Sequence, residues 1–201
     1  VTSVKEASIT VKVTATDGTN TVSATKTIAF VDSSNAVTNA YWNFFTMPST
    51  LTNETLTTDA DLTSHAVTTN ADYEVQGATL KIIENSTTGV SKPGLKWKYE
   101  SETKYGLYTN YSESVTATDP AKAAGLMELV IDKASLVTII ASGNGDSGSY
   151  RLVSVWDSST ENCYGYKDSL VSEEFKTLEV NNGATVAAGT YYIYVNGARI
   201  H

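Results

Sequence analysis

Short stretches of alternating apolar and polar residues run along most of the chain. Residues 9–15 and 21–30 both show this period of two, which is the pattern of a half-buried β-strand. Asp17 and Gly18 lie between the two stretches and supply the residue types that tight turns require. The sequence therefore predicts a β-hairpin over residues 9–30.

Residues 31–40 have the small, polar composition of a linker. An isolated hairpin is only marginally stable in water, so we predict that residues 1–34 are a hairpin and linker and that residues 35–201 form the main domain. The stretch "ITVKVTATDGTNTVSATKTIAFV" resembles the last two strands of the immunoglobulin-like repeats of bacterial surface proteins and secreted polysaccharidases. That resemblance implies the remnant of a truncated Ig-like domain, and a chain cut from a longer protein.

Beyond residue 40, short apolar segments recur with Gly, Asn and Asp between them, which indicates an all-β fold, an antiparallel β-sandwich or jelly roll. A helix of one or two turns is predicted only at 119–125, where a proline occupies the first helical position. Asp132 and Lys133 are expected to form a hairpin turn between two of the strands. The predicted strands are 78–84, 94–100, 125–131, 134–142, 149–157, 175–183 and 189–200.

Composition and charge narrow the classes of partner. The 201 residues carry a net charge of −8, which argues against nucleic acid because phosphate binding needs clustered lysine and arginine. The single cysteine, Cys163, excludes an internal disulfide framework, and the sequence has no apolar run long enough to span a bilayer. Only 18% of residues are charged, and Thr, Ser and Asn are abundant. We expect a monomeric secreted or cell-surface protein.

The sequence offers little catalytic chemistry. Residues 145–148 spell Gly-Asp-Ser-Gly, the string around the nucleophile of trypsin-like proteases, but only His65 and His201 could act as the base. The same residues are typical of a hairpin loop. A P-loop and a zinc-binding spacing are both missing from the sequence. Paired carboxylates of a glycosidase are not excluded by spacing, but the acidic residues fall mostly on alternating polar faces. We predict that the chain is not an enzyme.

No cofactor is assigned from the sequence, although calcium is a candidate structural ion. Three pairs of loop residues offer hard oxygen ligands, and none has the spacing of an EF-hand. The alternative is that these side chains bond their own turn backbone. The pairs are Asp59 with Asp61, Asn70 with Asp72, and Asn144 with Asp146.

A second resemblance rests on the order of four motifs, namely "WNFF" (42–45), "GATLKII" (77–83), "RLVSVWD" (151–157) and "GTYYIYVNGARI" (189–200). In this order they resemble a non-catalytic β-sandwich domain that accompanies bacterial pectate lyases. The resemblance implies a carbohydrate-binding module that targets pectin (homogalacturonan) or another plant cell wall polysaccharide. The catalytic domain would then lie elsewhere in the parent chain. The alternative is a structural spacer or adhesin-type domain without a ligand.

Sugar-binding sandwiches place aromatic rings against the apolar faces of sugar rings, and arginine or lysine can pair with a uronate carboxylate. Trp42, Trp97 and Tyr99 fall in core-like patterns, so we look to loop-like surroundings and to the 149–157 strand. For each tyrosine the competing interpretation is an edge residue with its hydroxyl in water. The candidate ligand-binding residues are Tyr105, Tyr108, Tyr111, Arg151, Trp156, Tyr164, Tyr166 and Lys167.

In the strand over 149–157, alternation puts Arg151 and Trp156 on opposite faces. Val153 and Val155 share the face of Arg151 and make it the more apolar one. We therefore predict that Trp156 faces outward, and that Arg151 closes the edge of the core and pairs with Asp157.

Overall fold

The structure is a computed structural model in which two compact units are distinct, Val1–Asn39 and Ala40–His201. The predicted boundary after residue 34 falls within 32–39, outside the described residues. The described residues are 6–31, 40–46, 48–52, 64–83, 94–111, 115–119, 123–146 and 148–201.

The first unit contains the predicted hairpin, which is confirmed. Strands β1 (Glu6–Thr16) and β2 (Thr21–Val31) pair antiparallel along their whole length. In the turn, the Asp17 carboxylate accepts hydrogen bonds from the backbone N–H groups of Thr19 and Asn20, at 3.0 and 2.7 Å. Val13 lies directly opposite Ala24, and Val13 is exposed. The apolar face of the hairpin is therefore open at this pair.

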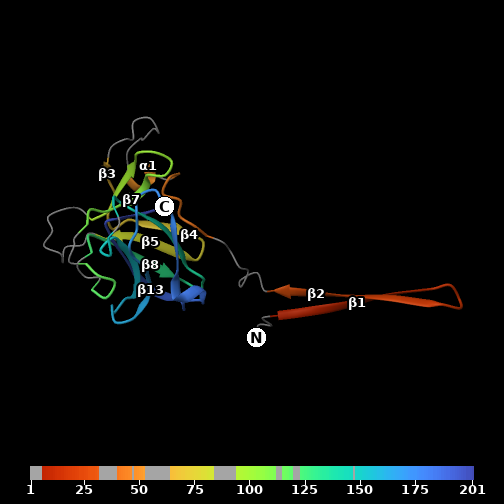
Figure 1. Ribbon diagram of the computed structural model, residues 1–201. Helices are drawn as coiled ribbons and strands as arrows, with labels where there is room; N and C mark the ends of the chain where they lie inside the picture. The colour runs from red at the N-terminus through yellow and green to blue at the C-terminus, as the bar shows by residue number, and fades with distance from the viewer. Residues whose placement is uncertain are drawn as a thin grey trace. The chain divides into compact units, whose positions relative to one another are not determined.

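The second unit is an antiparallel β-sandwich, as predicted, while its jelly-roll topology stays a prediction. Its two six-stranded sheets have the orders β11-β10-β13-β8-β5-β4, called the β8 sheet, and β12-β9-β14-β7-β6-β3, called the β9 sheet. Figure 1 labels β13, β8, β5 and β4 of the β8 sheet and β7 and β3 of the β9 sheet. The β8 sheet comprises β4 (Asp72–Val75), β5 (Ala78–Ile83), β8 (Gly125–Ile131), β10 (Leu152–Asp157), β11 (Cys163–Lys167) and β13 (Gly189–Asn196). The β9 sheet comprises β3 (Ser64–Ala66), β6 (Lys96–Tyr99), β7 (Tyr105–Tyr108), β9 (Thr138–Gly143), β12 (Lys176–Glu179) and β14 (Ala198–Ile200).

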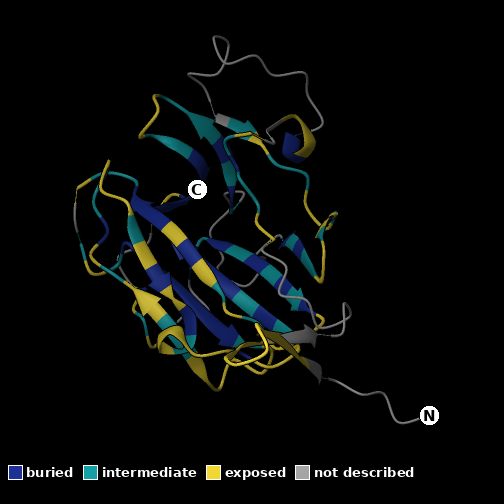
Figure 2. Cartoon of the chain, turned by 90° about the vertical axis from the view of Figure 1, so that its right-hand side faces the viewer, coloured by how far each residue is buried: buried dark blue, intermediate teal, exposed yellow. Residues whose placement is uncertain are grey.

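Alternation along the strands directs one side chain in two into the space between the sheets. In β8, Met127, Leu129 and Ile131 are buried while the residues between them are partly exposed, as expected for period two. Figure 2 shows the same banding of buried and exposed residues along the strands. Trp97 of β6, in the β9 sheet, is also buried. Its indole N–H donates to the Phe44 carbonyl at 2.6 Å. The prediction that Trp97 belongs to the core is confirmed.

The outer face of β10 is also covered, which the sequence did not indicate. Leu152 and Trp156 point away from the main core, yet both are buried. They form a second apolar cluster with Val115, Ala123 and Tyr194. Trp156 does lie opposite the core face, but the prediction that it is exposed there is wrong because Val115 and Ala123 pack in the same cluster and help to bury it.

The predicted hairpin turn at Asp132 and Lys133 is wrong. Strand β8 is hydrogen-bonded on both sides, to β5 and β13, so β9 has no free edge beside it. Residues 132–137 instead carry the chain from the β8 sheet to the β9 sheet, where β9 pairs with β12 and β14.

Helices contribute little to the described residues. The one α-helix there is the five-residue α1 (Pro48–Thr52), and η4 (Val180–Gly183) is a 3-10 turn. The helix predicted at 119–125 lies partly outside the described residues. Within the described ranges, no helix combines the length and apolarity needed to cross a membrane.

Candidate functional site

The candidate site lies around Gly197, a one-residue corner at which the chain passes from one sheet to the other. Strand β13 belongs to the β8 sheet and β14 to the β9 sheet, and Gly197 alone connects them with a φ of +55°. Its N–H donates to the Asn110 carbonyl at 2.9 Å, and its carbonyl accepts from the Asn144 N–H at 2.9 Å. A Cβ at this position would lie 2.7 Å from Tyr111 Cβ and 3.1 Å from Arg151 Cγ. The absence of a side chain therefore lets Tyr111 and Arg151 approach the corner.

Tyr111, Tyr150 and Arg151 form a compact stack at this corner. The Arg151 guanidinium carbon lies 4.7 Å from the centroid of the Tyr111 ring and 5.6 Å from that of Tyr150. The two rings are 5.1 Å apart and inclined by 30°. Arg151 is buried, whereas Tyr111 is 49% exposed. Arg151 and Tyr150 therefore pack against the Tyr111 ring, while about half of this residue stays open to solvent.

Arg151 does not pair with Asp157, so that part of the prediction is wrong. Its Nη1 donates to the backbone carbonyls of Asn144 at 2.6 Å and Gly197 at 3.4 Å. The Asp157 carboxylate instead accepts from Ser159 Oγ at 2.9 Å and Asn162 Nδ2 at 2.6 Å. These bonds, led by the one from Asn162, lower the pKa of Asp157 to about 2. Arg151 thus packs against Tyr111 as a positioning residue, and its Nη1 is hydrogen-bonded to backbone carbonyls.

A chain of polar contacts runs from this stack across the outer face of the β9 sheet. Asn144 links the two arginines: its carbonyl accepts from Arg151, and its Oδ1 accepts from Arg199 Nη2 at 3.0 Å. Arg199 Nη2 also donates to Glu100 Oε2 at 3.0 Å, and Glu100 forms an ion pair with Lys98. Lys98 in turn lies 5.6 Å from the centroid of the Tyr108 ring. We call this set, from Lys98 to Tyr111, the polar strip.

Unpaired polar atoms concentrate on or beside the polar strip. Arg199 is 2% exposed, and its Nε and Nη1 have no hydrogen-bond partner among the described residues. Each buried unpaired donor carries a desolvation cost. The other such side-chain atoms in the described part of the chain are Thr109 Oγ1, Arg151 Nε and His201 Nδ1.

The other predicted site residues fall in three places. Tyr105 and Tyr108 were expected in a loop but lie at the two ends of β7. Tyr108 is opposite Arg199, in the polar strip. Tyr105 contacts Phe45, Phe175 and His201, with ring centroids 4.7, 6.3 and 4.9 Å apart.

Tyr164, Tyr166 and Lys167 belong to β11, an edge strand of the β8 sheet, and not to a loop. Tyr166 lies opposite Ser154 on the outer face and is 50% exposed. A register shift between Val155 and Trp156 leaves Tyr164 facing inward, where its ring lies 5.2 Å from that of Tyr191. The predicted residues therefore do not form one surface: Tyr108, Tyr111 and Arg151 share the polar strip, and β11 and buried Trp156 lie apart from it.

Sequence reasoning missed Asn144 as a connecting residue, and it missed Glu100 and Arg199 as site residues. One signal was available for Arg199. It lies in the apolar segment "YIYVNGARI", and a buried arginine nearly always has a partner. The sequence did not identify that partner, because Glu100 is 99 residues away along the chain.

Two of the calcium candidates, Asn144 and Asp72, are engaged with other side chains or with the backbone. Asn144 uses its Oδ1 on Arg199 and its Nδ2 on the Thr109 carbonyl at 3.1 Å. Asp72 forms an ion pair with Lys81 at 3.2 Å, and Asp59 and Asp61 lie outside the described residues. Across the ranges that are described, no three His, Cys, Asp or Glu side chains cluster as metal ligands would.

One serine side chain, that of Ser142, lies within hydrogen-bond distance of a histidine, His201. Ser142 Oγ and His201 Nε2 are 2.8 Å apart. Burial, and then the nearby Arg199 charge, lower the pKa of His201 to about 4, so the imidazole is neutral at pH 7. Ser142 is 0% exposed, and no described residue orients His201 Nδ1. The pair lacks both the access and the third group that an activated serine needs.

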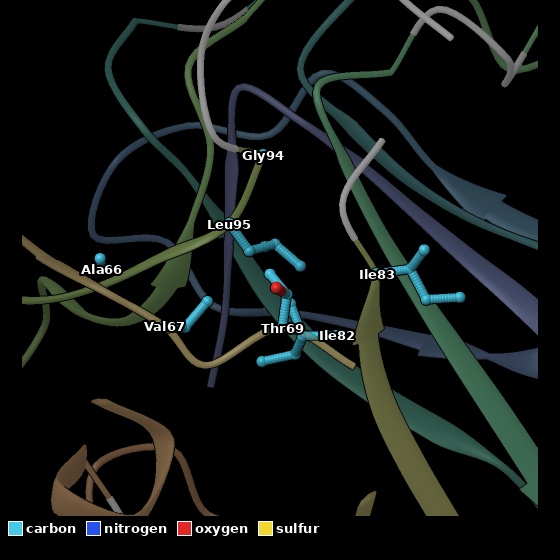
Figure 3. Close-up of a pocket in the computed structure, with 7 residues that line it drawn as sticks. All are labelled: Ala66, Val67, Thr69, Ile82, Ile83, Gly94 and Leu95. Carbon is cyan, nitrogen blue, oxygen red and sulfur yellow. The ribbon is translucent and has the colours of Figure 1, made fainter. Parts of the chain in front are cut away.

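A cavity of about 220 Å³ lies apart from the polar strip. Its lining side chains are apolar apart from the Thr69 hydroxyl (Figure 3). Ligand sites combine apolar walls with several convergent polar groups, and this cavity offers one polar side chain. The lining residues are Ala66, Val67, Thr69, Ile82, Ile83, Gly94 and Leu95.

Comparisons with protein-family models, with curated proteins and with solved structures give no match for the chain. Its fold, an antiparallel β-sandwich, and the polar strip are therefore the observations from which a function is argued.

Proposed function

We propose that the second unit is a non-catalytic carbohydrate-binding module whose contact surface is centred on Tyr111. The observation that carries this proposal is the stack itself: a ring 49% exposed and held on a buried guanidinium 4.7 Å away. A fixed ring binds with less loss of side-chain entropy than a mobile one. The exposed part of the ring suits the apolar C–H face of a sugar ring.

The neighbouring groups supply hydrogen bonds and charge. Lys98 lies near the other end of the polar strip, partly exposed and 5.6 Å from the Tyr108 ring centroid. A lysine there can pair with a carboxylate of an acidic sugar. The resemblance to domains that accompany pectate lyases makes homogalacturonan the first polysaccharide to test. Secretion, and a polysaccharide-degrading catalytic domain in the same parent chain, are parts of the same proposal.

The test is affinity electrophoresis of the full chain in gels containing homogalacturonan, xylan, mannan or β-glucan, with and without calcium. At least one polysaccharide is expected to retard the chain, and Tyr111→Ala is expected to abolish that retardation. Tyr166→Ala is the matched control, because Tyr166 is also about half exposed, at 50%, but lies on β11. Circular dichroism of both variants checks that the fold is kept.

Three outcomes would count against the proposal. Unchanged mobility in all four gels would remove plant cell wall polysaccharides as ligands. Loss of binding in Tyr166→Ala with retention in Tyr111→Ala would move the site to β11. Retention in both variants would exclude the two most exposed of the predicted site tyrosines as the contact.

A structural spacer without a ligand is the second candidate, and the first unit favours it. In the β1–β2 hairpin, Val13 and Val22 are exposed on apolar cross-strand pairs with Ala24 and Ala15. An exposed apolar sheet face is typical of an element that packs against another β-layer. A chain built from successive β-units would have this property, and failure of every polysaccharide gel would favour this function.

A further inference from the structure

On the outer face of the β9 sheet, a row of neighbouring side chains is shielded from solvent at one end. Ser142 lies opposite Arg199, which lies opposite Tyr108, so the three side chains share the outer face. Ser142 and Arg199 are 0% and 2% exposed, whereas Ile140, on the same face of β9, is 46% exposed. A segment outside the sheet must therefore cover the Ser142 end of the row.

That segment is the connection from β11 to β12. The Val171 carbonyl accepts from the Gly143 N–H at 2.7 Å, and the Ser172 N–H donates to the Gly145 carbonyl at 3.0 Å. Lys176 is paired with Ala141, so Phe175, one residue earlier, is next to Ser142. We call residues 171–175 the gate.

The Phe175 ring is the cover. Its centroid lies 4.4 Å from that of His201 and 6.3 Å from that of Tyr105. His201 is hydrogen-bonded to Ser142, so Phe175 packs against the imidazole that contacts the Ser142 hydroxyl. Phe175 itself is 45% exposed.

Buried residues flank the gate, and beyond the backbone hydrogen bonds of Val171 and Ser172 and the ring contacts of Phe175 its side chains form partly exposed ion pairs. Leu170 before it and Leu178 after it are both buried in the main core. Between these residues, Glu173 forms an ion pair with Lys104 at 2.6 Å, and both side chains are partly exposed. Glu173 also has a φ of +67°, a conformation that costs energy for a residue other than glycine. Exposed ion pairs contribute little stability, so a weak contact opposes local strain.

We propose that the gate opens by breaking the Lys104–Glu173 pair, and that opening uncovers a second ring surface formed by Tyr105, His201 and Ser142. Rings beside a buried hydroxyl suit a sugar residue, by the same chemistry as the Tyr111 stack. The identity of the ligand rests on the proposed function, whereas the opening does not. Ser142 of this surface lies opposite Arg199 of the polar strip, so one glycan chain could contact both this surface and the Tyr111 stack.

Amide hydrogen exchange and histidine NMR on the full chain test the opening without a ligand. Glu173→Gln removes the ion pair with almost no change in shape. Glu174→Gln is the matched control, because Glu174 is the adjacent residue, has a similarly exposed side chain (57% against 53%), and pairs with Lys176 instead. Glu173→Gln is expected to speed exchange of the Ser172 N–H and to raise the pKa of His201 from about 4 towards its ordinary value. His65, the other histidine, is the internal reference.

Equal exchange and an equal His201 pKa in both variants would overturn the gate. The ligand arm adds galacturonate oligosaccharides to Glu173→Gln, and a shift of the His201 signals is expected. If these oligosaccharides perturb Tyr111 but leave His201 unmoved, the second surface is refuted while the proposed function stands. If they perturb neither residue, glycan binding fails for this ligand while the exchange data still decide the opening.

Discussion

The corner at Gly197 makes a quantitative prediction for Gly197→Ala. Two costs combine at this residue. A φ of +55° is a left-handed conformation, which costs about 1–2 kcal/mol for a residue with a Cβ. The new Cβ would also lie 2.7 Å from Tyr111 Cβ, where carbon atoms ordinarily sit about 3.5–4.0 Å apart. Relieving such an overlap costs about 1–3 kcal/mol more.

Gly77→Ala separates the two costs. Gly77 also has a positive φ, +80°, but a Cβ there would have no atom within 4 Å. We expect Gly77→Ala to lower the free energy of unfolding by about 1–2 kcal/mol, from strain alone. Gly197→Ala should lower it by about 2–5 kcal/mol, the sum of strain and overlap.

Urea unfolding followed by tryptophan fluorescence measures both variants in the full chain. Trp42, Trp97 and Trp156 all lie after residue 39, so the signal reports the second unit alone. Equal destabilisation by the two substitutions would refute the close approach of Tyr111 and Arg151 to the corner. Gly197→Ala should also weaken any glycan binding that depends on Tyr111, and Gly77→Ala should leave it unchanged.

Two further predictions concern His201 and Trp97. The pKa of His201 is about 4 in the folded chain against an ordinary 6.5, so the unfolded chain binds the proton first as pH falls. About 3 kcal/mol of stability, fully present above pH 6.5, should be lost between pH 6.5 and 4. Urea unfolding at pH 7 and 4.5 checks this, and His201→Gln should remove the dependence; an equal loss in that variant would assign it to other groups. Trp97→Phe removes the 2.6 Å bond to the Phe44 carbonyl and leaves a void, so a loss of about 2–4 kcal/mol is expected, and a loss below about 1 kcal/mol would contradict the packing of this side chain.

The strands of the sandwich were predictable because their burial depends on local alternation. The predicted segment 125–131 coincides with β8, and Trp97 is in the core as its position in the alternation indicated. The prediction was wrong at Asp132 and Lys133, because two strands adjacent in sequence look alike whether they pair or lie in different sheets. Only the partners of β8, which come from distant parts of the chain, decide between the two.

The site was less predictable than the fold. Alternation correctly separated Arg151 from Trp156, but a strand pattern carries no information about covering residues, and Val115 and Ala123 help to bury Trp156. The polar strip depends on Asn144 meeting Arg199 across 55 residues of sequence. A single sequence has no local signal for such a contact. Tyr111 was found because an aromatic residue in polar surroundings is conspicuous, whereas its support on Arg151 required the three-dimensional structure.

The position of the last two strands has a consequence for how the protein is made. Strand β13 lies between β8 and β10 in one sheet, and β14 lies between β7 and β9 in the other, so residues 189–200 occupy interior places in both layers. A ribosome releases these residues after all the strands they join. Until then β8 and β10 lack their shared partner β13, and β7 and β9 lack β14. Such unpaired strand edges favour aggregation. Both layers therefore gain their interior strands in one step, after the strands on either side have been made.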